Sequence, residues 1–143
     1  MKHSGVSICA ILFLTGCATT VPIPIQEAKQ VPADRLLAFQ EPHEGVTATV
    51  IVTRDRGLPG IACYLAIAIN GTVAARLAAE ETATFYVEPG ETLLRVGGDA
   101  LGRGLCGFSE NYWTQRETIL RANETKHFRL SINGVKADIE RSD

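Results

Sequence analysis

The chain has 143 residues, with 14 basic and 16 acidic side chains and a formal net charge of −2. A chain of this length can form one domain with a hydrophobic core. The near balance of charge, without a basic stripe, argues against nucleic acid as a partner.

The N-terminus has the pattern of a bacterial lipoprotein signal peptide. Lys2 supplies the positive charge, and residues 6–14 form an apolar core too short to cross a bilayer, which takes about 20 residues. The sequence Leu14-Thr15-Gly16-Cys17 resembles a lipobox, in which the cysteine becomes the first mature residue and is lipidated. We therefore expect a signal peptide over residues 1–16 and a lipid anchor on Cys17. An ordinary secretory signal with a chance cysteine is the alternative.

The residues after the lipobox predict where the protein lies and how it is held. Ala18 stands where an aspartate would retain a lipoprotein at the inner membrane in enteric-type sorting, so we expect the outer membrane, facing the periplasm. Several acyl chains hold a protein stably. Three prolines in residues 17–34 disfavour regular structure, which predicts a tether with an r.m.s. reach of about 20–25 Å. Residues 35–39 are expected to dock onto the domain as a short helix or an edge strand.

From residue 46 onward the chain alternates as β-strands do. Strands are expected over residues 46–54 and 61–70, and Asn70-Gly71 predicts a type I′ hairpin turn. Residues 74–81 fit a return strand, although their composition also favours a helix. Later strands are expected over residues 72–79, 82–88, 91–96, 115–122, 125–133 and 135–141, with a tight turn at Asn133-Gly134. The pattern predicts an all-β fold, a small antiparallel β-sandwich of seven or eight strands over residues 35–143.

One stretch resembles a known class of domain. Asn70-Gly71, Ala75-Arg76-Leu77 and the run from Thr84 to Glu91 (TFYVEPGE) resemble bacterial lipoproteins with a PEGA-like or transthyretin-like β-sandwich. The similarity covers residues 46–96, and Glu91-Thr92 stands where such domains often have a His-Thr pair. The resemblance implies a sandwich fold and no catalytic residues.

Two cysteines remain after the lipidated one, Cys63 and Cys106. In an oxidising periplasm such a pair in a small exported domain favours a disulfide, which we predict. The alternative is a Cys106–His127 dyad for nucleophilic catalysis. His43 has no second nitrogen ligand at a useful spacing, so we expect no metal site.

A glycine-rich loop over residues 97–113 is the most unusual segment of the mature chain. Its Gly-x-Gly-x-x-Gly spacing matches a dinucleotide fingerprint only formally, because that motif requires a βαβ unit, so no cofactor is expected. The loop also contains side chains of the types enriched at binding hot spots. They are Arg103, Phe108, Tyr112 and Trp113. The alternative is that Tyr112 and Trp113 cover the core.

These observations together predict a non-enzymatic lipoprotein. It is expected to display a periplasmic β-sandwich as a scaffold or partner-binding module, attached to the membrane through Cys17, with an envelope protein as partner. One alternative is a transthyretin-like lipoprotein of a secretion-system envelope complex. The other is a cell-wall thiol hydrolase that uses Cys106.

Overall fold

The computed structural model describes residues 19–99, 101–102, 106 and 113–142. Within them lie nine strands and two short 3-10 helices. In chain order these are η1 (Ile25–Glu27), β1 (Lys29–Gln30), η2 (Ala33–Arg35), β2 (Ala48–Arg54), β3 (Leu65–Ile69), β4 (Thr72–Leu77), β5 (Glu81–Val87), β6 (Gly90–Gly98), β7 (Thr114–Leu120), β8 (Thr125–Asn133) and β9 (Lys136–Arg141).

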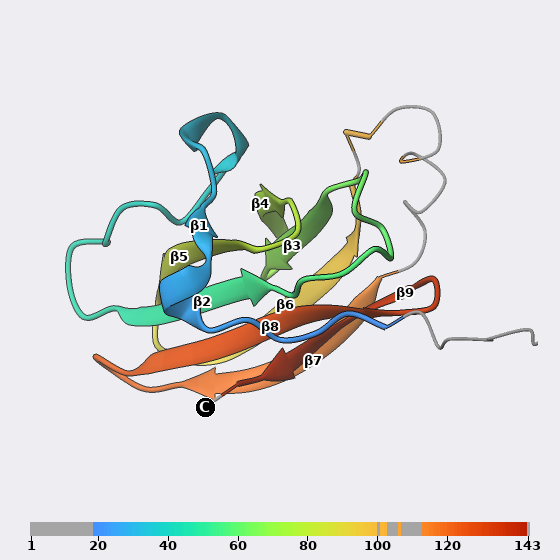
Figure 1. The fold of residues 1–143 in the computed structure, drawn as a ribbon. Helices are drawn as coiled ribbons and strands as arrows, with labels where there is room; N and C mark the ends of the chain where they lie inside the picture. Colours follow the sequence, from blue (N-terminus) through green and yellow to red (C-terminus); the bar gives the residue numbers. More distant parts are fainter. Residues whose placement is uncertain (1–18, 100, 103–105, 107–112, 143) are drawn as a thin grey trace, which may run out of the picture.

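The strands form two sheets that pack face to face (Figure 1). One sheet has the order β1-β5-β2-β8-β9 and the other the order β4-β3-β6-β7. The predicted all-β sandwich is confirmed. Two pairs of neighbouring strands run parallel, β1 with β5 and β2 with β8, so the sandwich is not purely antiparallel. The β2–β8 pair joins strands far apart in sequence, which hairpin signals could not predict.

The core lies between the sheets and follows the alternation of the strands. Val50 and Val52 of β2 face Ile67 of β3 and Leu94 of β6 within one buried cluster, each with no exposed surface. Phe85 of β5 is equally buried in this cluster. Apolar side chains repeated every second residue therefore explain how both sheets bury one face.

The turns agree with the sequence, with one shift of register. Asn70 and Gly71 have φ of 48° and 85°, which are the values that a type I′ turn requires. Thr72–Leu77 is a strand, so the helical alternative for residues 74–81 is wrong. The last hairpin turns at Gly134-Val135 rather than at Asn133-Gly134, since Asn133 pairs with Lys136.

The segment expected to be a free tether is bonded to the sandwich from Thr19 onward, which corrects that prediction. Thr19 bridges Asn133, and β1 extends the sheet beside β5. Val31 is 4% exposed and belongs to the core. Between the prolines, backbone N–H groups remain free to bond the edge of a sheet, which an exposed edge strand favours. Residues 35–39 dock onto the domain as expected: Arg35 ends η2, Leu36 bridges Ala75 of β4, and Phe39 packs against the core.

Candidate functional site

One end of the sandwich combines the disulfide, the turn between β2 and β3, the β8–β9 turn and the first described residue (Figure 1). We call it the disulfide end. The sulfur atoms of Cys63 and Cys106 are 2.07 Å apart and the Cα atoms 5.4 Å apart, so the predicted disulfide is confirmed. Cys63 precedes β3 and Cys106 follows β6. The bond thus ties the glycine-rich loop to the turn that leads into β3.

A buried arginine fixes the turn between β2 and β3. Arg54, the last residue of β2, is 1% exposed. Its Nη1 donates to the carbonyls of Cys63 and Leu77, both at 2.7 Å, and its Nη2 donates to the carbonyl of Gly60 at 2.7 Å. Burial lowers the pKa of Arg54 to about 10, so the group remains protonated at neutral pH. The Arg54 cation therefore holds in place the backbone of Cys63 and of the turn before it.

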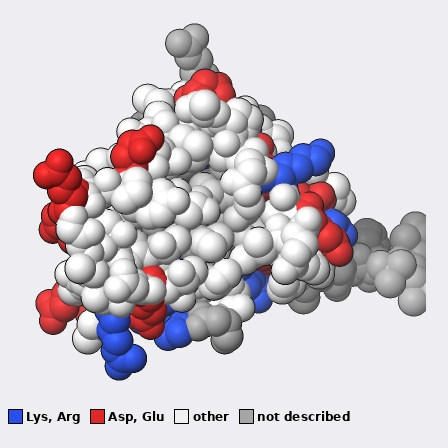
Figure 2. All heavy atoms as spheres, turned by 90° about the vertical axis from the view of Figure 1, so that its left-hand side faces the viewer, with Lys and Arg blue, Asp and Glu red and all other residues white. Residues whose placement is uncertain are grey.

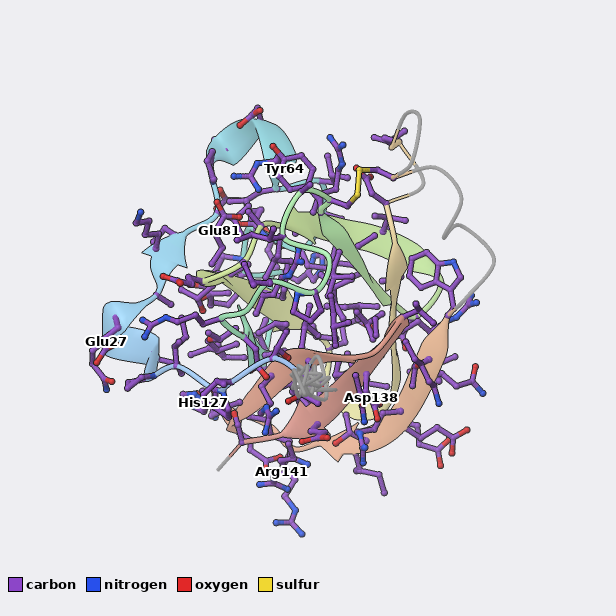
Figure 3. All side chains as sticks on the ribbon, turned by 45° about the vertical axis from the view of Figure 1, so that its right-hand side comes forward. Glu27, Tyr64, Glu81, His127, Asp138 and Arg141 are labelled. Carbon is purple, nitrogen blue, oxygen red and sulfur yellow. A yellow bond between two sulfur atoms is a disulfide. The ribbon has the colours of Figure 1, made fainter. Side chains whose placement is uncertain are left out.

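Tyr64, next to the disulfide, lies against two arginines (Figure 3). The guanidinium carbon of Arg35 is 4.4 Å from the ring centroid and that of Arg76 is 5.0 Å away. Arg35 donates to both oxygens of Glu81 at 2.7 and 2.6 Å, and Arg76 donates to both oxygens of Asp99 at 2.8 and 2.5 Å. These hydrogen bonds are the main reason that the pKa values of both arginines are raised. The cluster joins four separate chain segments around the tyrosine.

Trp113 lies just before β7 and covers a glycine of the neighbouring strand. Val96 faces the core, so Gly97 lies on the outer face of its sheet, and a Cβ there would meet the indole at 2.6 Å. The Arg95 guanidinium carbon lies 5.1 Å from the ring centroid. Trp113 is half-buried on this outer face and does not enter the core.

The other predicted site residues lie outside the part of the chain that the structure describes. They are Cys17, which is the predicted lipidation site, and the loop residues Arg103, Phe108 and Tyr112.

The structure does not bring the alternative catalytic pair together. The sulfur of Cys106 is bonded to Cys63, so it is not a thiol here. His127 lies on β8 beside the N-terminal segment (Figure 3), in an open groove of about 570 Å³ that Pro22 and Arg129 also line. Arg129 pairs with Asp55 at 2.8 Å in this groove. His43 lies exposed in the loop before β2.

Sequence reasoning missed the charged residues that organise this end. Arg54 continues the inward positions of Val50 and Val52, so its alternation with the core was the signal that it is buried. Nothing comparable identifies Arg35 or Asp99, because their partners are distant in sequence.

No protein-family model matches the chain, and no curated protein matches its sequence. Within the described residues there is no group of three or more histidine, cysteine or acidic side chains that could hold a metal ion. The described part of the chain also has no helix long and apolar enough to span a membrane.

Proposed function

We propose that this protein is a lipoprotein of the bacterial outer membrane that displays a disulfide-bonded β-sandwich in the periplasm as a partner-binding module. The observation that supports it best is the lipobox Leu14-Thr15-Gly16-Cys17, which stands directly before the sandwich domain. Cys17 would hold acyl chains, and the domain would remain at the membrane surface.

The arrangement of charges supports a binding role rather than a catalytic one. In the buried ion pair Arg35–Glu81 and the partly buried ion pair Arg76–Asp99, each side chain has the other as its partner. Their charges hold separate chain segments together near the disulfide, which in turn bonds the glycine-rich loop to the domain. The side-chain types in this loop suit contacts with another protein.

The first test is the chemical state of the N-terminus. We expect mass spectrometry of the full chain, purified from bacterial membranes, to find a mature protein that begins at Cys17 with acyl chains attached. The C17S variant should lack the acyl mass and retain its signal peptide. A wild-type protein cleaved elsewhere and without acyl chains would refute the proposed anchor.

The second test concerns the partner. A photoreactive amino acid at position 103 or 113, introduced in living cells, should form a discrete adduct with an envelope protein. Position 119 is the matched control, because Ile119 is 64% exposed on β7 near the opposite end. Equal adducts at position 119, or none at the two loop positions, would contradict a binding role for the loop.

A further inference from the structure

Only one residue, Ala18, separates the predicted anchor Cys17 from Thr19, the first residue that bonds to the folded domain. Thr19 bridges Asn133, and the N–H groups of Val21 and Arg56 donate to each other's carbonyls at 2.7 and 2.9 Å. A chain spans at most about 3.6 Å per residue, so the Cα atom of Cys17 lies within about 7 Å of that of Thr19. The head-group layer on each side of a bilayer is about 5–8 Å thick. An acylated Cys17 would therefore hold Thr19 at the level of the head groups.

Large apolar side chains are exposed at the same end. Val135 in the β8–β9 turn is 99% exposed, and Leu58 and Ile61 in the turn after β2 are 83% and 57% exposed. We call these three residues the apolar patch. Figure 1 shows both turns at the right-hand end, where the described chain begins.

The two turns of the apolar patch are in contact. A Cβ on Gly60 would lie 2.7 Å from Cδ1 of Ile132, and Gly60, Ile132 and Val135 line one hollow of about 230 Å³. A Cβ on Gly57 would lie 3.1 Å from Thr20, at the start of the described chain. The two turns that carry the patch thus pack against each other, and the first of them packs against the start of the described chain.

The opposite end of the sandwich has acidic side chains spread over it. Figure 2 views that end and shows separate groups of acidic side chains across it, with basic side chains at its lower and right-hand edges. The exposed carboxylates include Glu41 and Glu44 before β2, Glu88 after β5 and Glu91 in β6. At the other end, Lys136 is exposed next to Val135. Anionic head groups attract basic side chains and repel acidic ones, so this asymmetry favours the disulfide end as the membrane-facing end.

We infer that the disulfide end rests on the lipid bilayer, with Leu58, Ile61 and Val135 at the boundary between head groups and acyl chains. This inference depends on the proposed acylation of Cys17 and adds the orientation of the domain and the residues that contact lipid. The apolar face of an interfacial helix is buried by about 5–10 Å at this boundary, and the same attraction acts on exposed apolar side chains held there by an anchor. The acidic end then points into the periplasm.

The test uses the lipidated full chain in vesicles of phosphatidylethanolamine and phosphatidylglycerol, with or without brominated acyl chains. A tryptophan is introduced by V135W or, as the control at the opposite end, by V46W, since Val46 is also an exposed apolar residue. Trp113 is present in both variants, so the difference between them reports on the introduced indole. Bromine quenches indoles only at close range. We expect V135W to lose about half of its added emission and V46W to lose little.

The outcomes separate the two proposals. Acylated protein with equal quenching of V135W and V46W overturns the orientation and leaves the lipid anchor intact. Protein without acyl chains on Cys17 overturns both. The L58W variant gives a second, independent measurement of quenching at the apolar patch, so a folding defect in V135W does not decide the result. Stronger quenching of L58W than of V46W supports the orientation, and equal quenching refutes it.

Discussion

Thr20 and Ile132 exchange two hydrogen bonds although they are 112 residues apart in the chain. The N–H of Thr20 donates to the carbonyl of Ile132 at 3.0 Å, and the N–H of Ile132 donates to Oγ1 of Thr20 at 2.8 Å. The same hydroxyl donates to Asp55 at 3.1 Å. This pairing fixes the start of the domain to β8 and sets how closely the sandwich follows the proposed anchor at Cys17.

The T20V substitution removes the hydroxyl while it keeps the shape of the side chain. It leaves the N–H of Ile132 without its acceptor and removes one donor to Asp55. We expect the free energy of unfolding to fall by about 1–3 kcal/mol in urea titrations of the full chain. T72V is the control, because Thr72 is exposed at the start of β4, and it should change stability by less than about 0.5 kcal/mol. Equal effects of the two variants would contradict a special role for Thr20.

A flexible spacer between Ala18 and Thr19 should release the domain from the bilayer. Ten glycine and serine residues add an r.m.s. reach of about 17 Å, more than the thickness of the head-group layer. In vesicles with brominated lipids, the spacer should weaken the quenching of V135W severalfold and leave the V46W signal unchanged. A spacer that leaves the quenching of V135W intact would mean that the apolar patch binds the bilayer without help from a short anchor.

The disulfide predicts that its two cysteines behave as a unit. In the chain-entropy model, C63S and C106S should each lower the free energy of unfolding by roughly 4 kcal/mol, since the bond closes a loop of 43 residues. The double variant should be no less stable than either single variant. Guanidinium titrations at one pH check this. A thiol with a catalytic role would instead make C106S and C63S differ in an activity and not in stability.

The buried pair of Arg35 and Glu81 should be costly to break on one side. Both side chains are about 10% exposed, so R35M leaves the Glu81 carboxylate largely buried without its partner. We expect a loss of about 3–5 kcal/mol from R35M and a smaller loss from the double variant R35M/E81M. Thermal or urea unfolding provides the measurement.

The exposed pair of Arg56 and Glu80 is the matched control for this prediction. Its side chains are 54% and 40% exposed, so R56M should cost less than about 1 kcal/mol. If R35M and R56M destabilised the protein equally, burial of the Arg35–Glu81 pair would not be what makes it important.

Local sequence patterns predicted most of the strands because they act within a few residues. Alternation in Thr125–Asn133 gave the observed bounds of β8, and Asn70-Gly71 formed the expected turn because both residues tolerate positive φ. The pairing of Cys63 with Cys106 followed from their being the two cysteines after the predicted anchor. The candidate binding loop was predicted from residue types alone. Of its four predicted contact residues, the structure describes Trp113, whose indole packs on β6.

The sequence by itself determined the all-β class, the Asn70-Gly71 turn and the disulfide, because each depends on local backbone preference or on a count of residues. Only the tertiary structure decided that residues 19–34 lie along the sandwich, that Arg54 is a buried cation and that Gly60 and Val135 line one hollow. These features depend on hydrogen bonds and contacts between segments distant in the chain. Proline content shows that a segment cannot form a regular helix, but the free edge of β5 decides whether that segment stays in solvent or joins the sheet.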